Sequence, residues 1–231
     1  MDKLGFIELL LESHALKFGD FTTKSGRQSP YFVNVGSIAS GKNLGKLADY
    51  YFEAYEQYVP TDINHLYGPA YKGISLSVLL AERVYSRLGR DLKVSYNRKE
   101  VKDHGEGGQF IGAPLGAGDE VYIIEDILTG GTSIRESIRF LGQCGVSIRG
   151  ALVGIDRMEK GVMGDLSAKD EIEQEFGFPV HAIVNVEEIV ENLKEREVLG
   201  TIWLNSERLT AIHQYLTIHG SQGAIASYKF L

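Results

Sequence analysis

A thirteen-residue segment near the middle of the chain, from Val121 to Ser133, constrains the fold more than any other. It reads Val-Tyr-Ile-Ile-Glu-Asp-Ile-Leu-Thr-Gly-Gly-Thr-Ser. The apolar start indicates a buried strand, and the glycine turn leads into Ile134, Ile138 and Leu141, which are spaced as on one face of a helix. A buried strand that turns into a helix is the unit of parallel sheets, so this segment predicts an α/β fold.

The same alternation of strand and helix extends along the chain. The N-terminal segment, residues 1–20, is predicted to form an amphipathic helix. A helix is also expected at 206–217, in a tail after Gly200 to which we assign no role. Between these ends the pattern predicts strands at 31–35, 64–67, 92–96, 121–124, 151–155 and 180–184, with helices at 44–58, 76–88 and 134–141. Right-handed crossovers then give an open, mainly parallel twisted sheet flanked by helices, with ligands at the carboxyl ends of the strands.

Size and composition exclude several classes of protein. A chain of 231 residues with 43% hydrophobic content forms one domain without covalent staples. Its single cysteine, Cys144, cannot form an internal disulfide, so we expect a reducing cytoplasm. A membrane span is excluded because no run of about 18 apolar residues occurs. The net charge of -7 argues against broad nucleic-acid binding.

Two carboxylates and a hydroxyl-rich glycine turn follow the central strand. Glu125 and Asp126 end the strand, and the residues from Thr129 to Ser133 can direct backbone N–H groups and hydroxyls at an anion. The helix dipole adds attraction at the same point, which suits a sugar phosphate. The alternative is a capping box between Ser133 and Glu136 beside two solvated acids.

A cluster of cations lies at the start of a glycine-rich stretch in this otherwise acidic chain. The sequence from Asn97 to Gly108 is Asn-Arg-Lys-Glu-Val-Lys-Asp-His-Gly-Glu-Gly-Gly, with six glycines between residues 104 and 118. We expect this mobile segment, called the lid below, to close over a polyanion and to exclude water. The alternative is a solvated run of charge.

Three further segments suit anionic ligands. Gly68-Pro-Ala-Tyr-Lys-Gly73 makes a tight strand-to-helix turn with one cation, unless it is only structural. The segment from Phe21 to Asn34 mixes cations with aromatic residues, which suits a flat anionic ring, although it also reads as an ordinary basic turn before a strand. Asp156-Arg157 ends a strand, and its alternative is a surface arginine.

A rival phosphate loop lies between Gly36 and Asn43. Gly-Ser-Ile-Ala-Ser-Gly-Lys-Asn matches G-x-x-x-x-G-K after a strand-like run, so a P-loop NTPase is an alternative. Asn43 stands where the Ser or Thr that ligates magnesium is needed, which argues against it. The plainer interpretation is a turn that enters the helix at Leu44.

The motifs resemble those of one family. Val121 to Ser133 closely resembles the ribose-phosphate-binding signature of the type I phosphoribosyltransferases, and the lid resembles the catalytic lid of the orotate phosphoribosyltransferases within that family. The turn from Gly68 to Gly73 resembles their diphosphate loop, and the segment from Phe21 to Asn34 resembles their N-terminal hood. The matches run from residue 1 to about 197 in family order, and the tail is not covered.

The resemblance implies a fold, a reaction and partners. The fold is the type I phosphoribosyltransferase fold in a single domain over residues 1–231, with a hood of about 1–40 plus the C-terminal helices and a core of about 41–185. The reaction is that of a pentosyltransferase, in which orotate and 5-phosphoribosyl 1-diphosphate give orotidine 5'-monophosphate and diphosphate with Mg2+. The enzyme is a homodimer in which each lid reaches the neighbouring subunit's active site.

The resemblance also implies roles for individual residues. Residues expected to act in catalysis are Lys102, Glu125 and Asp126. Residues expected to bind phosphoribosyl diphosphate are Lys24, Tyr71, Lys72, Arg98, Lys99, Lys102, His104, Glu125, Asp126, Ile127, Leu128, Thr129, Gly130, Gly131, Thr132 and Ser133. Residues expected to bind orotate are Phe32, Val33, Thr129 and Arg157. Magnesium is bridged by the substrate, with Glu125 and Asp126 reached through water.

Two other transferase-like classes stay open. A phosphoribosyltransferase-like regulator that binds nucleotides together with RNA or DNA would carry a basic face or an added winged helix, and neither is evident in the sequence. A purine-specific transferase would share the phosphoribosyl signature, but the hood and lid sequences argue against it.

Overall fold

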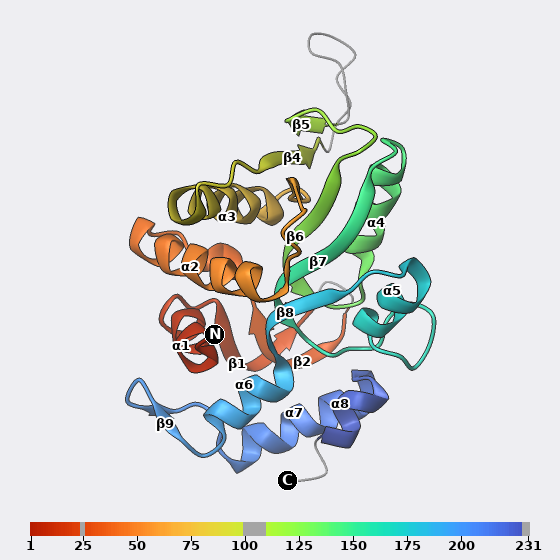
Figure 1. Cartoon of the computed structure of the whole chain (residues 1–231). Helices are drawn as coiled ribbons and strands as arrows, with labels where there is room; N and C mark the ends of the chain where they lie inside the picture. Colours follow the sequence, from red (N-terminus) through yellow and green to blue (C-terminus); the bar gives the residue numbers. More distant parts are fainter. Residues whose placement is uncertain (24–25, 99–109, 228–231) are drawn as a thin grey trace.

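A six-stranded sheet forms the centre of the computed structural model, which describes residues 1–23, 26–98 and 110–227 (Figure 1). The strand order is β5-β4-β3-β6-β7-β8. These strands are β3 (His65–Tyr67), β4 (Lys93–Asn97), β5 (Phe110–Gly112), β6 (Glu120–Leu128), β7 (Ser147–Asp156) and β8 (Val180–Asn185). All neighbours pair in parallel except β5, which runs antiparallel to β4 at the edge. The predicted open, mainly parallel α/β sheet is confirmed.

Helices cover both faces of the sheet. The helices α2 (Gly41–Tyr58) and α3 (Lys72–Leu88) lie on one face, and α4 (Thr132–Gly142) and α5 (Ala168–Phe176) lie on the other (Figure 1). Alternate residues of β6 divide between the two cores. Tyr122 and Ile124 pack with the α2 and α3 residues, whereas Val121 and Ile123 pack with those of α4 and α5. This two-sided burial explains why the strand is a continuous apolar run rather than an alternating one.

A second group of elements joins the two ends of the chain. The helix α1 (Lys3–Glu12) is followed by the antiparallel hairpin of β1 (Leu16–Thr22) and β2 (Gln28–Val33). After β8 come α6 (Val186–Leu193), the short strands β9 (Glu197–Val198) and β10 (Thr201–Ile202), α7 (Ser206–His219) and α8 (Gln222–Ser227). In Figure 1 these elements lie together below the sheet, next to the carboxyl end of β7, with α1 against β1 and α7 near β2.

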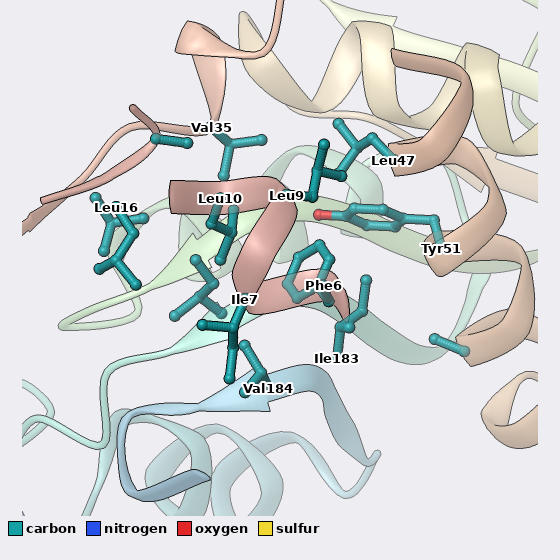
Figure 2. Close-up of a cluster of buried hydrophobic side chains, with 14 of the residues drawn as sticks. Phe6, Ile7, Leu9, Leu10, Leu16, Val35, Leu47, Tyr51, Ile183 and Val184 are labelled. Atoms are coloured by element: carbon teal, nitrogen blue, oxygen red, sulfur yellow. The ribbon is translucent and has the colours of Figure 1, made fainter. Parts of the chain in front are cut away.

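Apolar side chains of α1 attach this group to the core. Phe6, Ile7, Leu9 and Leu10 are almost fully buried. Figure 2 shows them between Leu16 of the hairpin, Leu47 and Tyr51 of α2, and Ile183 and Val184 of β8. Burying large apolar side chains contributes about 1.5 to 3 kcal/mol each, so α1 fixes the hairpin relative to the sheet.

The segment from Gly36 to Asn43 is a turn that enters a helix. A single 3-10 turn, η1 (Val35–Ser37), precedes α2, and the side chain of Ser40 accepts the backbone N–H of Asn43 as a helix cap. The strand before it, β2, belongs to the antiparallel hairpin and not to the parallel sheet. A P-loop requires a strand of that sheet, so the structure agrees with the plainer interpretation.

The strongly periodic elements lie where they were predicted, with shifts of a few residues at their ends. The elements β1, α5 and α6 were not predicted. The two helices could have been predicted from their capping residues, because Ser167 caps α5 beside Asp170, and Asn185 forms a full capping box with Glu188 at α6. Within residues 1–23, 26–98 and 110–227, none of the helices combines the length and hydropathy needed to cross a bilayer.

Candidate active site

The acidic pair lies at the carboxyl end of β6, the strand between β3 and β7. Glu125 is 6% exposed and Asp126 is 5% exposed. The hydroxyl of Tyr51 donates a 2.8 Å hydrogen bond to the backbone oxygen of Glu125. A Cβ on Gly154 would lie 2.8 Å from that hydroxyl, so glycine is needed at this point of β7. Tyr51 therefore supports the strand end from beneath the acids.

Burial makes this pair electrostatically unusual. Burial first, and the Asp126 charge second, raise the pKa of Glu125 to about 7. Glu125 accepts the hydroxyl of Ser133 and, at 2.9 Å, the backbone N–H of Asp126. Asp126 accepts the ammonium of Lys72 at 2.7 Å. The pair thus presents two acceptor carboxylates at a strand end, with one cation already bound to them.

The turn after β6 has the features of an anion site. Gly131 precedes α4 with φ of +79°, and a Cβ there would lie 2.9 Å from Cδ1 of Ile172. Within the part of the chain that the structure describes, no side chain caps the N-terminus of α4. Its first N–H groups are therefore donors for a ligand. Ser133 donates to Glu125 instead of capping, so the capping-box alternative is wrong.

The turn from Gly68 to Gly73 closes against the same strand end. A Cβ on Gly68 would lie 2.1 Å from the backbone oxygen of Gly73, and one on Gly73 would lie 2.7 Å from the backbone oxygen of Ile124, which explains why both positions are glycine. The turn places Lys72 on Asp126 and leaves the side chain of Tyr71 69% exposed. The backbone N–H of Ala70 donates to Oδ1 of Asn97 at 2.9 Å, which joins the turn to the first residue of the lid.

A cavity lies beside this turn. Its volume is about 300 Å³, and it extends between the end of β3 and the start of α4. The lining includes Pro69, Asn97, Arg98, Ser133 and Arg139. Arg98 therefore faces the same space as the phosphate turn.

Arg157 directly follows β7, the neighbour of β6 in the sheet. Leu128 pairs with Asp156, and the backbone N–H of Arg157 donates to the oxygen of Leu128 at 3.0 Å. Arg157 is 5% exposed, and its guanidinium carbon lies 4.4 Å from the centroid of the Tyr31 ring. This pairing brings Arg157 beside Thr129, which is exposed.

The hairpin supplies the residues expected to meet the base. Phe32 is 38% exposed and stacks on Phe21, with ring centroids 5.5 Å apart. Val33 is buried. A 3.2 Å hydrogen bond from Nη2 of Arg157 to Ser29 holds β2 against the end of β7.

The structure brings most of the predicted residues to one edge of the sheet. Tyr71, Lys72, Arg98 and Arg157 gather there with the whole run from Glu125 to Ser133. Lys24, Lys99, Lys102 and His104 lie outside the described residues, so their predicted roles stay predictions. The sequence reading missed Ser29, Tyr31, Asn97, Glu159 and Tyr215. Of these residues, only Glu159 could have been proposed from the sequence, because it lies two residues after Arg157.

Asp156 gives a pH-dependent prediction for stability. Burial raises its pKa to about 6, although its Oδ1 accepts the N–H of Met158 at 2.8 Å. A raised carboxyl pKa stabilises the fold below the unfolded pKa near 4, and this contribution is lost as the pH rises through 6. The unfolding free energy of the wild type should therefore fall by up to about 3 kcal/mol as the pH rises. Asp156→Asn keeps the hydrogen-bond acceptor without the charge, so this fall should be absent in the variant.

Urea unfolding from pH 4 to pH 7.5 measures this fall in wild type and variant. Asp165→Asn is the control, because Asp165 has a 69% exposed side chain paired with Lys160. Equal pH dependence in wild type and Asp156→Asn would contradict the prediction.

Comparisons with known proteins agree with this geometry. The model of the phosphoribosyl transferase domain matches residues 34–184. A relative from Clostridium beijerinckii named orotate phosphoribosyltransferase is 42% identical over 221 residues, covering 95% of this chain and 98% of that protein. Another of that name from Lachnoclostridium phytofermentans is 44% identical over 219 residues, covering 94% and 97%.

A solved structure gives the same result. The crystal structure of orotate phosphoribosyltransferase from Francisella tularensis is similar to this chain with a TM-score of 0.78 and 37% identity, and the match covers 94% of this chain and 100% of that one. Identity well above 30% across nearly the whole length, together with the acidic pair and phosphate turn at the sheet edge, leaves one conclusion. The chain belongs to the orotate phosphoribosyltransferase family.

Proposed function

We propose that this protein transfers the phosphoribosyl group of 5-phosphoribosyl 1-diphosphate to orotate, giving orotidine 5'-monophosphate and diphosphate. The product is a pyrimidine nucleotide, so the reaction serves pyrimidine nucleotide synthesis, and we propose a cytoplasmic location. The observation that carries the proposal is the 3.0 Å bond between Arg157 and Leu128. This bond holds the buried guanidinium of Arg157 beside the carboxyl end of β6, which bears two carboxylates and leads into the anion-binding turn.

Each part of the donor has a partner of matching chemistry. The N–H groups and hydroxyls from Thr129 to Ser133 suit the 5'-phosphate, with Ile127 and Leu128 contributing backbone. Glu125 and Asp126 suit the ribose hydroxyls, since carboxylates accept hydrogen bonds from vicinal hydroxyls. The residues proposed for the diphosphate are Lys24, Tyr71, Lys72, Arg98, Lys99, Lys102 and His104.

Lys72 is held where the substrate needs it. In the free protein its ammonium lies 2.7 Å from Asp126 Oδ2. Ribose hydroxyls would replace it at Asp126, and the ammonium would then turn to the diphosphate. Its side chain is 42% exposed and thus free to move. Cations around the departing diphosphate stabilise charge that develops as the bond to the ribose breaks.

Orotate, the anionic base that accepts the phosphoribosyl group, needs a cation and a flat surface. Arg157 is proposed for the orotate carboxylate because its planar guanidinium suits that group. Thr129 and the backbone of Phe32 and Val33 complete the proposed base site. The carboxylates of Glu125 and Asp126 lie near the position of the ribosyl ring, where positive charge develops in the transition state.

Magnesium fits this donor set. Mg2+ uses one or two carboxylates together with substrate phosphates and water. Within the described residues no three His, Cys, Asp or Glu side chains group as metal ligands, so the fit is to a substrate-bridged ion. Glu125 and Asp126 would hold it, through water. When bound, Mg2+ neutralises charge on the diphosphate.

A second copy of the chain completes the proposed site. One face of α3 carries apolar side chains at helical spacing that are well exposed, namely Val78, Tyr85 and Leu88. Such a face on a monomer favours burial against a partner. We propose a homodimer in which each lid reaches the neighbouring active site. Contacts of α1 with α6 and of α7 with β2 support the proposed division into a core and a hood that includes the C-terminal helices.

A direct assay tests the proposed function. Purified protein with Mg2+ and phosphoribosyl diphosphate is expected to consume orotate, followed by its ultraviolet absorbance. Parallel reactions with uracil, hypoxanthine and adenine in place of orotate should show far slower turnover. Preference for a purine base would identify a purine transferase, and ATP hydrolysis without loss of orotate would contradict the proposal altogether.

A further inference from the structure

The C-terminal tail is bonded to the segment that carries Arg157. The backbone N–H of Lys160 donates to the oxygen of His219 at 2.9 Å, and that of Ser221 donates to the oxygen of Met158 at 2.9 Å. Glu159 and Gly220 form an antiparallel bridge between them. Residues 158–160 therefore pair with residues 219–221, at the end of α7.

Side chains extend this pairing to the guanidinium. Glu159 and Arg157 are both buried, and Nε of Arg157 donates to Oε1 of Glu159 at 2.7 Å. Tyr215 of α7 donates its hydroxyl to the same oxygen at 2.8 Å and accepts Nη2 of Arg157 at 3.2 Å. Nη2 also reaches Ser29, whose hydroxyl donates to the backbone oxygen of Tyr31 at 2.7 Å. These bonds connect the Nε and Nη2 groups of Arg157 to the hairpin, to Glu159 and to α7 in one network.

The backbone between the two charged residues is also fixed. Met158 has φ of +54°, a left-handed conformation that disfavours residues other than glycine. Its N–H donates to Asp156 and its oxygen accepts from Ser221. Such conformations persist where the surroundings hold them, and here the holding bond comes from the tail.

The network leaves one edge of the guanidinium for a ligand. Arginine has five N–H donors, of which Nε and Nη2 supply the three bonds above. Nη1 makes no hydrogen bond to any residue in the described ranges. Arg27 also approaches Glu159, at 3.5 Å from Oε2, so two arginines share this carboxylate. The remaining edge of Arg157 suits the carboxylate of an anionic base.

We propose that Glu159 and Tyr215 are positioning residues, which hold Arg157 in the orientation that receives the carboxylate of the pyrimidine substrate. This inference rests on the proposed function. It gives α7, the helix of the tail, a role in substrate recognition. Burial and the Glu159 charge raise the pKa of Tyr215, so its hydroxyl stays a donor at working pH.

Tyr215→Phe tests the proposal, because it removes the hydroxyl and keeps the ring. We expect the KM for orotate to rise about tenfold, as for loss of a hydrogen bond to a charged group. The kcat and the KM for phosphoribosyl diphosphate should stay within about twofold of wild type, because only the base site changes. Glu159→Gln, which loses the charge, should raise the orotate KM further.

Tyr55→Phe is the matched control. Tyr55 is also a buried tyrosine whose hydroxyl contacts an arginine, in this case Arg90, away from the candidate site. Its loss should leave the orotate KM unchanged. A loss of melting temperature in Tyr215→Phe with equal changes in kcat and both KM values would mean a purely structural role and would overturn the inference.

Arg157→Lys separates this inference from the proposed function. If wild type turns over orotate but Arg157→Lys keeps the wild-type orotate KM, the proposed role of Arg157 fails, and the positioning role fails with it. If Arg157→Lys raises the orotate KM and Tyr215→Phe does not, only the positioning role fails. If both raise it, Tyr215→Phe added to Arg157→Lys should have less than about twofold further effect, since the two act through one contact.

Discussion

Asp126→Asn is expected to lower kcat/KM for phosphoribosyl diphosphate by about 100-fold, in line with the loss of a hydrogen bond to a buried charged group. The variant keeps the shape of the side chain but not its charge. It therefore weakens the acceptor for a ribose hydroxyl and removes the charged partner of Lys72, which lies 2.7 Å away. Steady-state rates with varied phosphoribosyl diphosphate at saturating orotate measure the effect.

Asp119→Asn is a close control for this prediction. Asp119 is 7% exposed and accepts the ammonium of Lys93 at 2.8 Å, so it resembles Asp126 in burial and pairing. It precedes β6, at the opposite end of the strand from the candidate site, where it also accepts the N–H of Gly116. Its loss should reduce stability and leave kcat/KM near the wild-type value. Equal loss of activity in both variants would contradict a specific role for Asp126.

Lys102→Ala is expected to lower kcat by about 100- to 1,000-fold, the usual effect of removing one group that stabilises transition-state charge. Its proposed partner is the departing diphosphate, so the affinity for orotate should change little. Lys102→Arg keeps the charge and should recover part of the rate. Single-turnover rates and calorimetric binding of orotate measure the two effects, and equal losses in both would contradict the role.

The same two variants test the shared site of the proposed dimer. A mixed dimer of Asp126→Asn and Lys102→Ala subunits contains one fully wild-type site if the lid acts on the neighbouring subunit. Random mixing should then restore about a quarter of wild-type activity. A lid that acts within its own subunit leaves every site with one lesion, and mixing would restore nothing.

The sheet and the local motifs could be predicted from patterns within short stretches of sequence. The run from Val121 to Ser133 forms a strand, a turn and a helix start through contacts that lie within a few residues, so its pattern could be read directly. The glycines from Gly68 to Gly73 mark a tight turn for the same reason. The sequence alone did not distinguish a phosphate turn from a capping box. The structure does, because the hydroxyl of Ser133 donates to Glu125.

The way in which these motifs meet depends on contacts between residues that are far apart in the sequence. Lys72 reaches Asp126 across 54 positions of sequence, and Arg157 reaches Tyr215 across 58. Such pairs depend on the register of parallel strands and on how α7 packs against the hairpin, neither of which leaves a periodic signal in the chain. The tail showed no motif because its contribution is one buried hydroxyl and two backbone hydrogen bonds, whose role is apparent only from their position beside Arg157.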